Sequence, residues 1–569
     1  MKRKHKLDND YKEIFYKGTI TLLTTFGAGA LFGKENMMIA FIMVIGSSIL
    51  ASQDLKIKTL YKTIRLILLD ILIVGIAYIA SLNMWLAIPI NLATIFIIIY
   101  LNVSLYEPMT YRTFLMLYVF CQYTEITLLE IPKRIAMVIF TVTIVVIMIY
   151  IEQNKIKTLL PPQIEKAFRL LYGQLTLMQE GNFDTDISNE ISYHMNELAC
   201  TIYGSSFRRY FTTYIGKIHF YFYLNVSYFN FLLEQIYKQN KNGIFEEKHI
   251  GEIAELFNEI QRYFHRDIKR QDVIKKLEEY LDTHQPEDRL TKEITSTIFA
   301  LRKNFQELDN LSIKHTNNVY DEWKHTDLKQ LQHKIRQQFA PKGMSFNFAT
   351  RMSVVLTATL LIAQVLGFYK FIWAIIPIMS ITQPYVEDTN KRRIDRLESN
   401  LIAAFAITVI IDVIQVRWII VLLLVVAFYL YYGYKDYYHI SLFMTIISMC
   451  ISTVNAGINQ LFFYRVVYVT LGVVIVGLIS KIKPYRLEDG IKELVNEIET
   501  LNHILEEESI KYVQEKADLD RIREAIIYSA VLCQKLYLKN KKYQDKEVED
   551  LIRLNTEFVV RLGYSILRN

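Results

Sequence analysis

The chain has few cysteines, and none of them lies in a pairing pattern. Its 569 residues include four, too widely spaced for a C-x-x-C motif: Cys121, Cys200, Cys450 and Cys533. Neither a disulfide framework nor a zinc site is indicated. The eleven histidines form no H-E-x-x-H cluster, and the glycines at 27–33 lack the spacing of a phosphate-binding loop. The sequence therefore predicts no metal, no cofactor and no enzymatic reaction.

A concentrated basic face is also missing. The formal net charge of +7 is modest and spread along the chain, so nucleic-acid binding is not expected. No early apolar segment ends in a small-residue cleavage site, and we expect no cleaved signal peptide. The chain instead combines 52% hydrophobic with 22% charged residues. This combination is typical of a mosaic of very apolar blocks and charged helical segments.

Two blocks hold nearly all the long apolar runs. A membrane-spanning helix needs about 20 mainly apolar residues, and the runs lack the alternation of barrel strands, so helices are predicted. We expect six crossings in each block, at 14–33, 37–53, 65–81, 83–102, 111–129 and 133–151, then at 347–369, 371–386, 397–415, 417–434, 437–455 and 463–482. Some of these are slightly short and need flanking polar residues to complete them.

The predicted fold class is all-α, a duplicated transmembrane bundle of about 6+6 crossings with two cytoplasmic helical domains. Its predicted parts are 1–151, 152–343, 344–483 and 484–569. Basic residues gather before the first crossing and after the second crossing of each block, which places both termini in the cytoplasm of a cell membrane. Lys133 and Arg134 fall on the opposite side and run against this rule. The bias to Ile, Lys, Asn and Tyr favours a bacterial source.

The segment 210–233 permits two interpretations. It contains ten aromatic residues and a single formal charge, Lys217. We interpret it as a buried helix of the cytoplasmic domain, and the alternative is an interfacial or additional membrane segment. An additional crossing would reverse the expected side of everything that follows.

The two blocks resemble each other at a spacing of about 330 residues. Gln53-Asp54 precedes a basic run in the first block, as Gln383-Pro384 does in the second, and Arg134 and Arg465 each open a final helix. An even number of crossings makes the repeats parallel, and transporters often bind substrate between such repeats.

The second block is similar to the fusaric acid resistance and aromatic acid exporter family. The similarity rests on Arg351, Trp373-Ala374, Gln383-Pro384, Arg396, and Arg465 before a glycine-containing last helix. The alternation of six crossings and a soluble domain, repeated twice, also matches. The first block is a weaker match, with Met38-Ile39-Ala40 where a Trp-Ala is expected. The resemblance implies proton-driven efflux of aromatic carboxylates or related compounds.

Three carboxylates lie in or near the apolar runs, where a charge at mid-membrane costs about 2.5–3.5 kcal/mol. Asp70 is a candidate for a transport role, or alternatively sits at the cytoplasmic interface near the start of its helix. Glu125 is a proton-relay candidate or an outer-interface carboxylate. Asp412 precedes Arg417 by five residues, and an ion pair at the outer rim is the default interpretation.

Arginine, tryptophan and proline supply the remaining candidates. Guanidinium groups match carboxylates through paired hydrogen bonds, and the alternative role of these arginines is to fix topology. An aromatic side chain stacks an aromatic substrate or anchors a helix at the interface. Prolines in and after the eighth crossing break the helix and free backbone groups to line a cavity, or merely kink it. The residues concerned are Arg134, Arg351, Arg396, Arg465, Trp373, Pro377 and Pro384.

Three functions remain open from the sequence. The leading hypothesis is a proton-coupled exporter of small organic anions, whose partners are the lipid bilayer and those anions, with no nucleic acid and with a homo-oligomer as an open possibility. The second is a passive anion channel. The third is a membrane scaffold that acts through its cytoplasmic helical domains.

Overall fold

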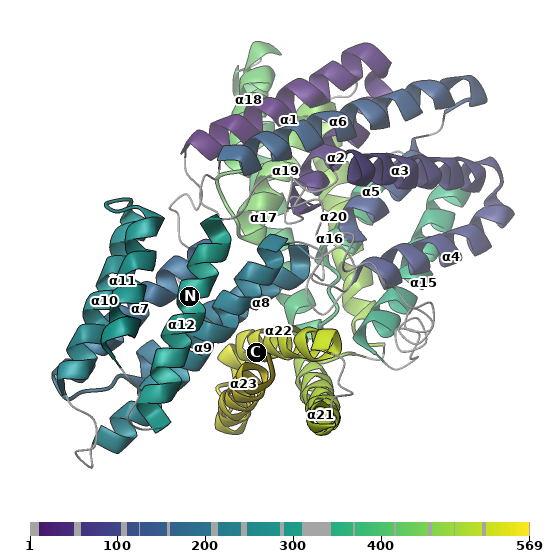
Figure 1. Ribbon diagram of the computed structural model, residues 1–569. Coiled ribbons are helices and arrows are strands. Elements are labelled where there is room, and N and C mark those ends of the chain that lie inside the picture. Colours follow the sequence, from purple (N-terminus) through teal and green to yellow (C-terminus); the bar gives the residue numbers. More distant parts are fainter. Residues whose placement is uncertain are drawn as a thin grey trace. The chain divides into compact units, whose positions relative to one another are not determined.

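Figure 1 shows the computed structural model of the chain. The described residues are 11–50, 59–103, 111–124, 126–155, 160–205, 214–240, 247–284, 289–309, 343–367, 370–414, 417–452, 458–482, 484–514 and 519–567. They are almost entirely helical and include no strand. They form two compact units, each assembled from two stretches of sequence. Unit 1 comprises residues 1–155 and 334–490, and unit 2 comprises residues 156–333 and 491–569.

Unit 1 contains one helix for each predicted crossing. The helices of its first half are α1 (Tyr11–Phe32), α2 (Lys34–Leu50), α3 (Thr59–Leu82), α4 (Met84–Asn102), α5 (Tyr111–Tyr123) and α6 (Ile131–Lys155). Those of its second half are α15 (Met344–Leu366), α16 (Ile372–Ile381), α17 (Val386–Ile414), α18 (Arg417–Tyr431), α19 (Tyr437–Ser452) and α20 (Ile458–Ile479). The all-helical fold class predicted from the apolar runs is confirmed.

Six helices among the described residues are long and apolar enough to cross a membrane. The qualifying segments are Thr63–Leu82, Met84–Asn102, Leu128–Ile151, Met344–Leu366, Val386–Ile414 and Gln460–Ile479. Large apolar side chains such as Leu68, Trp85 and Phe405 are exposed on their outer surfaces. Such surfaces are stable only against lipid, because water would hydrate them unfavourably. The chain is therefore a membrane protein.

Helix α16 is much shorter than the predicted crossing 371–386. It has ten residues and ends at Ile381. At a rise of about 1.5 Å per residue it spans roughly 15 Å, about half of a hydrocarbon core. Pro377 lies inside the helix and Pro384 follows it, and all but one of its residues are buried. A half-length helix therefore ends inside the bundle, surrounded by other helices.

The first helix of each half of unit 1 also packs against the other half. Helix α15 packs along α4, where Phe346 meets the rings of Phe96 and Tyr100 edge-on. In the same way α1 packs along α18, where the Phe15 ring stacks on Tyr429 at a centroid distance of 5.5 Å. The first helix of each half thus lies against the fourth helix of the other half. These contacts fix the halves into one bundle.

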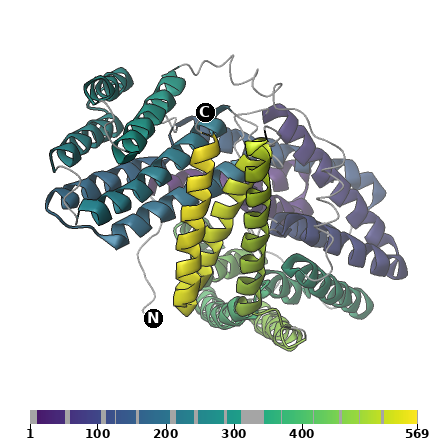
Figure 2. The same ribbon diagram turned by 60° about the horizontal axis from the view of Figure 1, so that its bottom comes forward.

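Unit 2 is built from amphipathic helices. They are α7 (Pro162–Gln179), α8 (Thr185–Ser205), α9 (Tyr214–Asn240), α10 (Glu247–His265), α11 (Arg270–Thr283), α12 (Arg289–Asp309), α22 (Leu519–Tyr543) and α23 (Lys546–Leu567). Helix α21 (Leu487–Val513) starts in the last residues of unit 1 and continues into unit 2. Figure 2 shows α23 in yellow, which packs against α22.

The described part of the aromatic segment, residues 214–233, forms most of α9, an interior helix of unit 2. Helix α9 contacts α7, α8, α12 and α23. Its rings join a buried aromatic cluster in which Phe229 stacks on Phe257 and Phe222 meets Phe305 edge-on. Contacts on several sides account for its aromatic composition, and α9 is not among the helices apolar enough to span a membrane.

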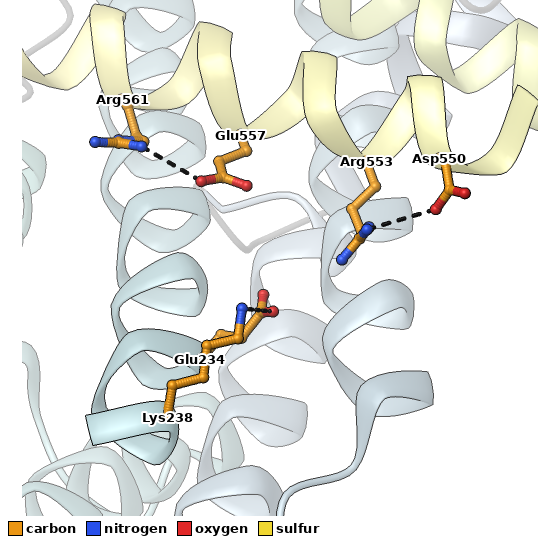
Figure 3. Close-up of polar contacts among 6 residues, drawn as sticks. All are labelled: Glu234, Lys238, Asp550, Arg553, Glu557 and Arg561. Carbon is orange, nitrogen blue, oxygen red and sulfur yellow. Dashed lines mark hydrogen bonds and ion pairs between the residues drawn. The ribbon is translucent and has the colours of Figure 1, made fainter. Parts of the chain in front are cut away.

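Many ion pairs on the surface of unit 2 connect neighbouring turns of one helix. Figure 3 shows Lys238 with Glu234 on α9, and Arg553 with Asp550 and Arg561 with Glu557 on α23, at 2.7, 3.4 and 3.4 Å. Exposed pairs of this kind are worth about 0.3–0.5 kcal/mol each. The stability of unit 2 therefore comes from its aromatic and aliphatic core.

Glu497 of α21 is a charged residue that is partly buried, unlike the exposed residues of these ion pairs. One of its carboxylate oxygens is buried without a hydrogen-bond partner in the described chain. Burial, helped by the nearby Glu493 carboxylate, raises the pKa of Glu497 to about 7, although Lys535 and Lys539 act in the opposite sense. The folded state therefore binds a proton that the unfolded chain has released by about pH 5.

The first prediction concerns α16 and α20. A Cβ atom on Gly472 would lie 2.6 Å from the carbonyl oxygen of Ala374 and 3.1 Å from the Cβ of Pro377. Gly472→Ala should therefore cost about 1–3 kcal/mol through overpacking and lower the melting temperature of the purified protein. Gly75→Ala is the matched control, because nothing lies within 4 Å of its added Cβ. Equal melting temperatures for the two variants would contradict the packing described here.

The second prediction concerns Glu497. Because its pKa is raised on folding, the stabilisation from its bound proton is complete below about pH 4 and is lost as the pH rises through about 7. Glu497→Gln should therefore stabilise the protein relative to wild type at about pH 8 and change it little at about pH 4. Thermal unfolding followed by circular dichroism measures both. Glu499→Gln, at an exposed position on the same helix, should show no such pH-dependent gain.

Candidate anion site in the membrane bundle

Arg465 of α20 is buried in the second half of unit 1, with 1% of its surface exposed. Its Nε donates to Oδ1 of Asn400 at 3.0 Å and its Nη2 donates to Oγ1 of Thr445 at 3.3 Å. The guanidinium carbon lies 5.0 Å from the centre of the Trp373 ring. The third nitrogen, Nη1, is buried and has no acceptor among the described residues.

Arg396 of α17 is the second buried cation in this region, with 2% of its surface exposed. Its Nη1 donates to Oγ of Ser441 at 2.9 Å, whereas its Nε and Nη2 have no acceptor in the described chain. The charges of Arg396 and Arg465 act on each other. Arg396 lies well inside the long helix α17 and is one of its buried residues.

A four-residue spacing of polar side chains on two helices brings the groups of this site together. Arg392, Arg396 and Asn400 recur every four residues along α17, and Tyr437, Ser441 and Thr445 do so along α19. Residues four apart share one face of a helix. Because α17 packs against α19 and α20, and α20 packs against α16 (Figure 1), both polar stripes face the interior of the bundle. The apolar residues between them face other helices or lipid.

The electrostatic balance of the site is incomplete. Within the described residues, neither Arg396 nor Arg465 forms an ion pair with a carboxylate, and their partners are neutral oxygens. Burying a cation without a counter-ion costs several kcal/mol even after relaxation. The two guanidinium groups present three nitrogens without acceptors, and a carboxylate is the anion whose geometry fits such groups. The arrangement can therefore bind a small anion that brings its own negative charge.

Arg134 of the first half, which the sequence pattern pairs with Arg465, has an acceptor for each of its three side-chain nitrogens. Arg134 at the start of α6 donates from Nε to Oδ1 of Asn36, from Nη1 to the carbonyl oxygens of Cys121 and Thr124, and from Nη2 to Oγ1 of Thr124, each at 3.0 Å. Only 1% of its surface is exposed. These bonds tie α2, α5 and α6 together and use four of the five N–H groups of Arg134. Arg134 therefore contributes to the packing of these helices.

Asp70 lies in the middle of α3, not near its start as one interpretation of the sequence had it. Only 4% of its surface is exposed, and its charge acts on Cys121 of α5. In the described chain it makes no hydrogen bond or ion pair. An ionised carboxyl group buried without a cation is costly, whereas the neutral acid is tolerated. Asp70 is thus the isolated acidic group of the bundle interior.

The other predicted site residues are distributed as follows. Arg351 of α15 donates from Nη2 to the carbonyl oxygens of Gln383 and Pro384, at 2.7 and 3.4 Å. Asp412 is exposed near the end of α17, and its proposed partner Arg417 has a side chain outside the described part. Glu125 also lies outside the described residues.

The residues that sequence reasoning missed are uncharged. Asn400, Ser441 and Thr445 hold the two buried arginines, and only their four-residue spacing from a charged or aromatic residue marks them in the sequence.

Comparison with known proteins adds one finding. Residues 357–479 match the sequence profile described as fusaric acid resistance protein-like. The match covers the second part of α15 and all of α16 to α20. It contains Trp373, Arg396 and Arg465, so the candidate site lies inside it. No curated protein matches the chain, and no solved structure does. The family is one of membrane transporters and not of enzymes. The chain is therefore a helical membrane protein whose second half carries a fusaric acid resistance protein-like domain.

Proposed function

We propose that the protein exports small organic anions of the aromatic carboxylate kind across the cell membrane, coupled to the proton gradient. The observation that carries the proposal is the pair of buried guanidinium groups, Arg396 and Arg465, which have unused donors and no carboxylate partner in the described chain. A site of this kind attracts an anion and holds it by hydrogen bonds alone. The family match to the same residues supports a transport role.

The ring of Trp373 gives the site an aromatic wall. It lies beneath the guanidinium group of Arg465, where the cation and the ring attract each other. A carboxylate bound to the free edge of Arg465 leaves its apolar body beside this ring. An aromatic body gains more from such a wall than an aliphatic chain does, because rings stack or meet edge-on. This accounts for the preferred substrate class.

Release of the anion requires that the site be stable when empty. The neutral oxygens of Asn400, Thr445 and Ser441 hold both arginines without neutralising them. A carboxylate in their place would bind each arginine permanently and compete with the substrate. Amide and hydroxyl partners therefore keep the arginines positioned and still available.

Proton coupling would use Asp70. A buried carboxyl group with no cation beside it costs much more free energy when ionised than when protonated. Movement that opens α3 to one side or the other would then be linked to the proton occupancy of Asp70. A passive channel has no need of such a group, and transport that is insensitive to the proton gradient would favour the channel.

The export direction follows from the predicted topology. Both termini and unit 2 would lie in the cytoplasm, because basic loops are retained on the cytoplasmic side of a membrane and both halves are expected to place theirs there. A reporter fused after Asn569 that is active only in the cytoplasm tests this placement. Activity of an extracellular reporter at the same position would reverse the direction of transport.

The third prediction addresses the anion site. Efflux of radiolabelled 4-hydroxybenzoate should be faster from cells that contain the protein. Arg465→Gln should raise the KM for efflux about tenfold to a hundredfold, because a hydrogen bond to a charged group is worth about 1.5–3 kcal/mol. Arg465→Lys keeps the charge but loses the planar guanidinium group. Its KM should therefore lie between those of wild type and Arg465→Gln.

Arg134→Gln is the matched control. It leaves Asn36 and the carbonyl groups of Cys121 and Thr124 without their donor, so it should lower the melting temperature without changing the KM of the protein that folds. Efflux by Arg465→Gln at the wild-type rate and KM, with equal protein in the membrane, would rule out the proposed site.

The fourth prediction addresses coupling. Asp70→Asn keeps the size of the side chain but fixes it in a neutral form. Efflux by this variant should no longer respond when a protonophore collapses the proton gradient, whereas its affinity for 4-hydroxybenzoate should equal that of wild type. Asp412→Asn, at an exposed carboxylate, should retain the full response. A normal protonophore response in Asp70→Asn would show that the coupling group is elsewhere.

A further inference from the structure

The C-terminal turn of α16 lies inside the bundle and has backbone oxygens without a hydrogen-bond donor from the helix itself. The carbonyl oxygen of Ser380 would accept from the residue four positions later, but that residue is Pro384, which has no N–H. The N–H of Gln383 is also diverted, because it donates to Oγ1 of Thr389 at 3.0 Å. The last turn of α16 therefore presents backbone oxygens that the helix itself does not satisfy.

Arginines from three other helices converge on these oxygens. Arg112 of α5 donates from Nη2 to the Ser380 oxygen at 3.1 Å, and Arg392 of α17 donates from Nη1 to the same oxygen at 3.2 Å. Arg351 of α15 donates to the Gln383 oxygen at 2.7 Å. Arg112 belongs to the first half of unit 1, and the other two belong to the second half. One small region thus collects cations from both halves.

Helix capping does not account for so much positive charge. A helix C-terminus carries the equivalent of about half a negative charge, and here it faces three full positive charges. Asp388 is the carboxylate whose charge acts on Arg392, and the nearby Glu387 accepts from the backbone of Leu487. The Nε atoms of Arg112 and Arg351 are buried and have no acceptor among the described residues. Two buried guanidinium donors, one from each half of unit 1, therefore remain without acceptors in the described chain.

Tyr437 links this region to the site at Arg465. Its hydroxyl group donates to Oγ of Ser380 at 3.0 Å, and its ring lies 4.6 Å from the guanidinium carbon of Arg392. It also neighbours Arg396, which lies one helical turn after Arg392 on the same face of α17. The two groups of arginines are therefore in series along α17, about 6 Å apart in helical rise, with Tyr437 beside both.

We propose that Arg112, Arg351 and Arg392, gathered around the open end of α16, form a second binding site for a carboxylate, shared by the two halves. The anion passes between this site and the one at Arg396 and Arg465. The passage rests on the proposed transport function, whereas the binding itself does not. Since the donors are buried among helices, a small soluble carboxylate fits the site better than a lipid phosphate with its acyl chains.

The test counts bound anions per chain. Equilibrium binding of radiolabelled 4-hydroxybenzoate to the full-length protein in detergent should give two molecules per chain. Arg112→Gln and Arg465→Gln should each reduce this number to one, and the double variant should bind none. Lys391→Gln, which removes an exposed cation one residue before Arg392, should still bind two.

Arg112→Lys shows whether a lost binding site in Arg112→Gln results from misfolding or from loss of the guanidinium group. This variant keeps the charge, so it should retain two bound molecules and a near-normal melting temperature, with the second molecule held at least tenfold more weakly. One molecule per chain in wild type, lost in Arg465→Gln and unaffected by Arg112→Gln, would overturn the second site. Two bound molecules without any efflux would leave the second site standing and reject the transport function instead.

The lipid alternative is an arm of the same experiment. Binding is repeated in lipid nanodiscs of phosphatidylcholine with and without phosphatidylglycerol. Two bound carboxylates in both membranes supports the proposal. If phosphatidylglycerol reduces the number to one in wild type and has no effect in Arg112→Gln, the site holds a lipid phosphate, and the carboxylate assignment is overturned.

Discussion

The constraint on which the rest of unit 1 depends is the cost of a guanidinium group inside a membrane protein. An arginine at mid-membrane is expensive unless protein groups replace the water it loses. Arg134 meets this requirement with acceptors for Nε, Nη1 and Nη2, whereas Arg396 and Arg465 meet it only in part. The same residue type therefore cross-links helices in one half and leaves donors open in the other. In the proposed transporter, one half of the bundle supplies rigidity while the other half holds the ligand.

The packing of unit 1 supports such a division of roles. Helix α15 of the second half lies on α4, and α1 of the first half lies on α18, so neither half has a complete surface of its own. The close approach of Gly472 to the backbone of α16 holds the short helix that carries Trp373. The aromatic wall of the site is thereby fixed by backbone packing as well as by side-chain contacts. A binding site on a rigid frame loses less entropy when it is filled.

Much of this fold could be predicted from the sequence, because lipid imposes length and apolarity on every crossing. The apolar runs marked all twelve helices of unit 1, and the aromatic segment around Phe222 and Phe229 was correctly interpreted as an interior helix. Arg465 and Trp373 were selected as candidate site residues from the sequence. Their partners were not, because Asn400 and Thr445 carry no charge and appear ordinary in an apolar run. The burial of Arg396 and the convergence of Arg112 and Arg392 on Ser380 depend on how α5, α16 and α17 meet, which one sequence does not encode locally.

The proposed coupling between protonation of Asp70 and anion binding must act between the two halves of unit 1. Asp70 lies in the first half, whereas Arg396 and Arg465 lie in the second. Asp70 is on α3, and α3 packs against α4, α5 and α6, all in the first half. Proton occupancy can affect the anion only through contacts between the halves, and Arg112 is such a contact, since it rises from α5 and reaches the end of α16. Helix α5 touches both α3 and α16. In the proposed mechanism, a displacement of α3 that follows protonation of Asp70 has a short mechanical route to the end of α16, through α5 and the guanidinium group of Arg112.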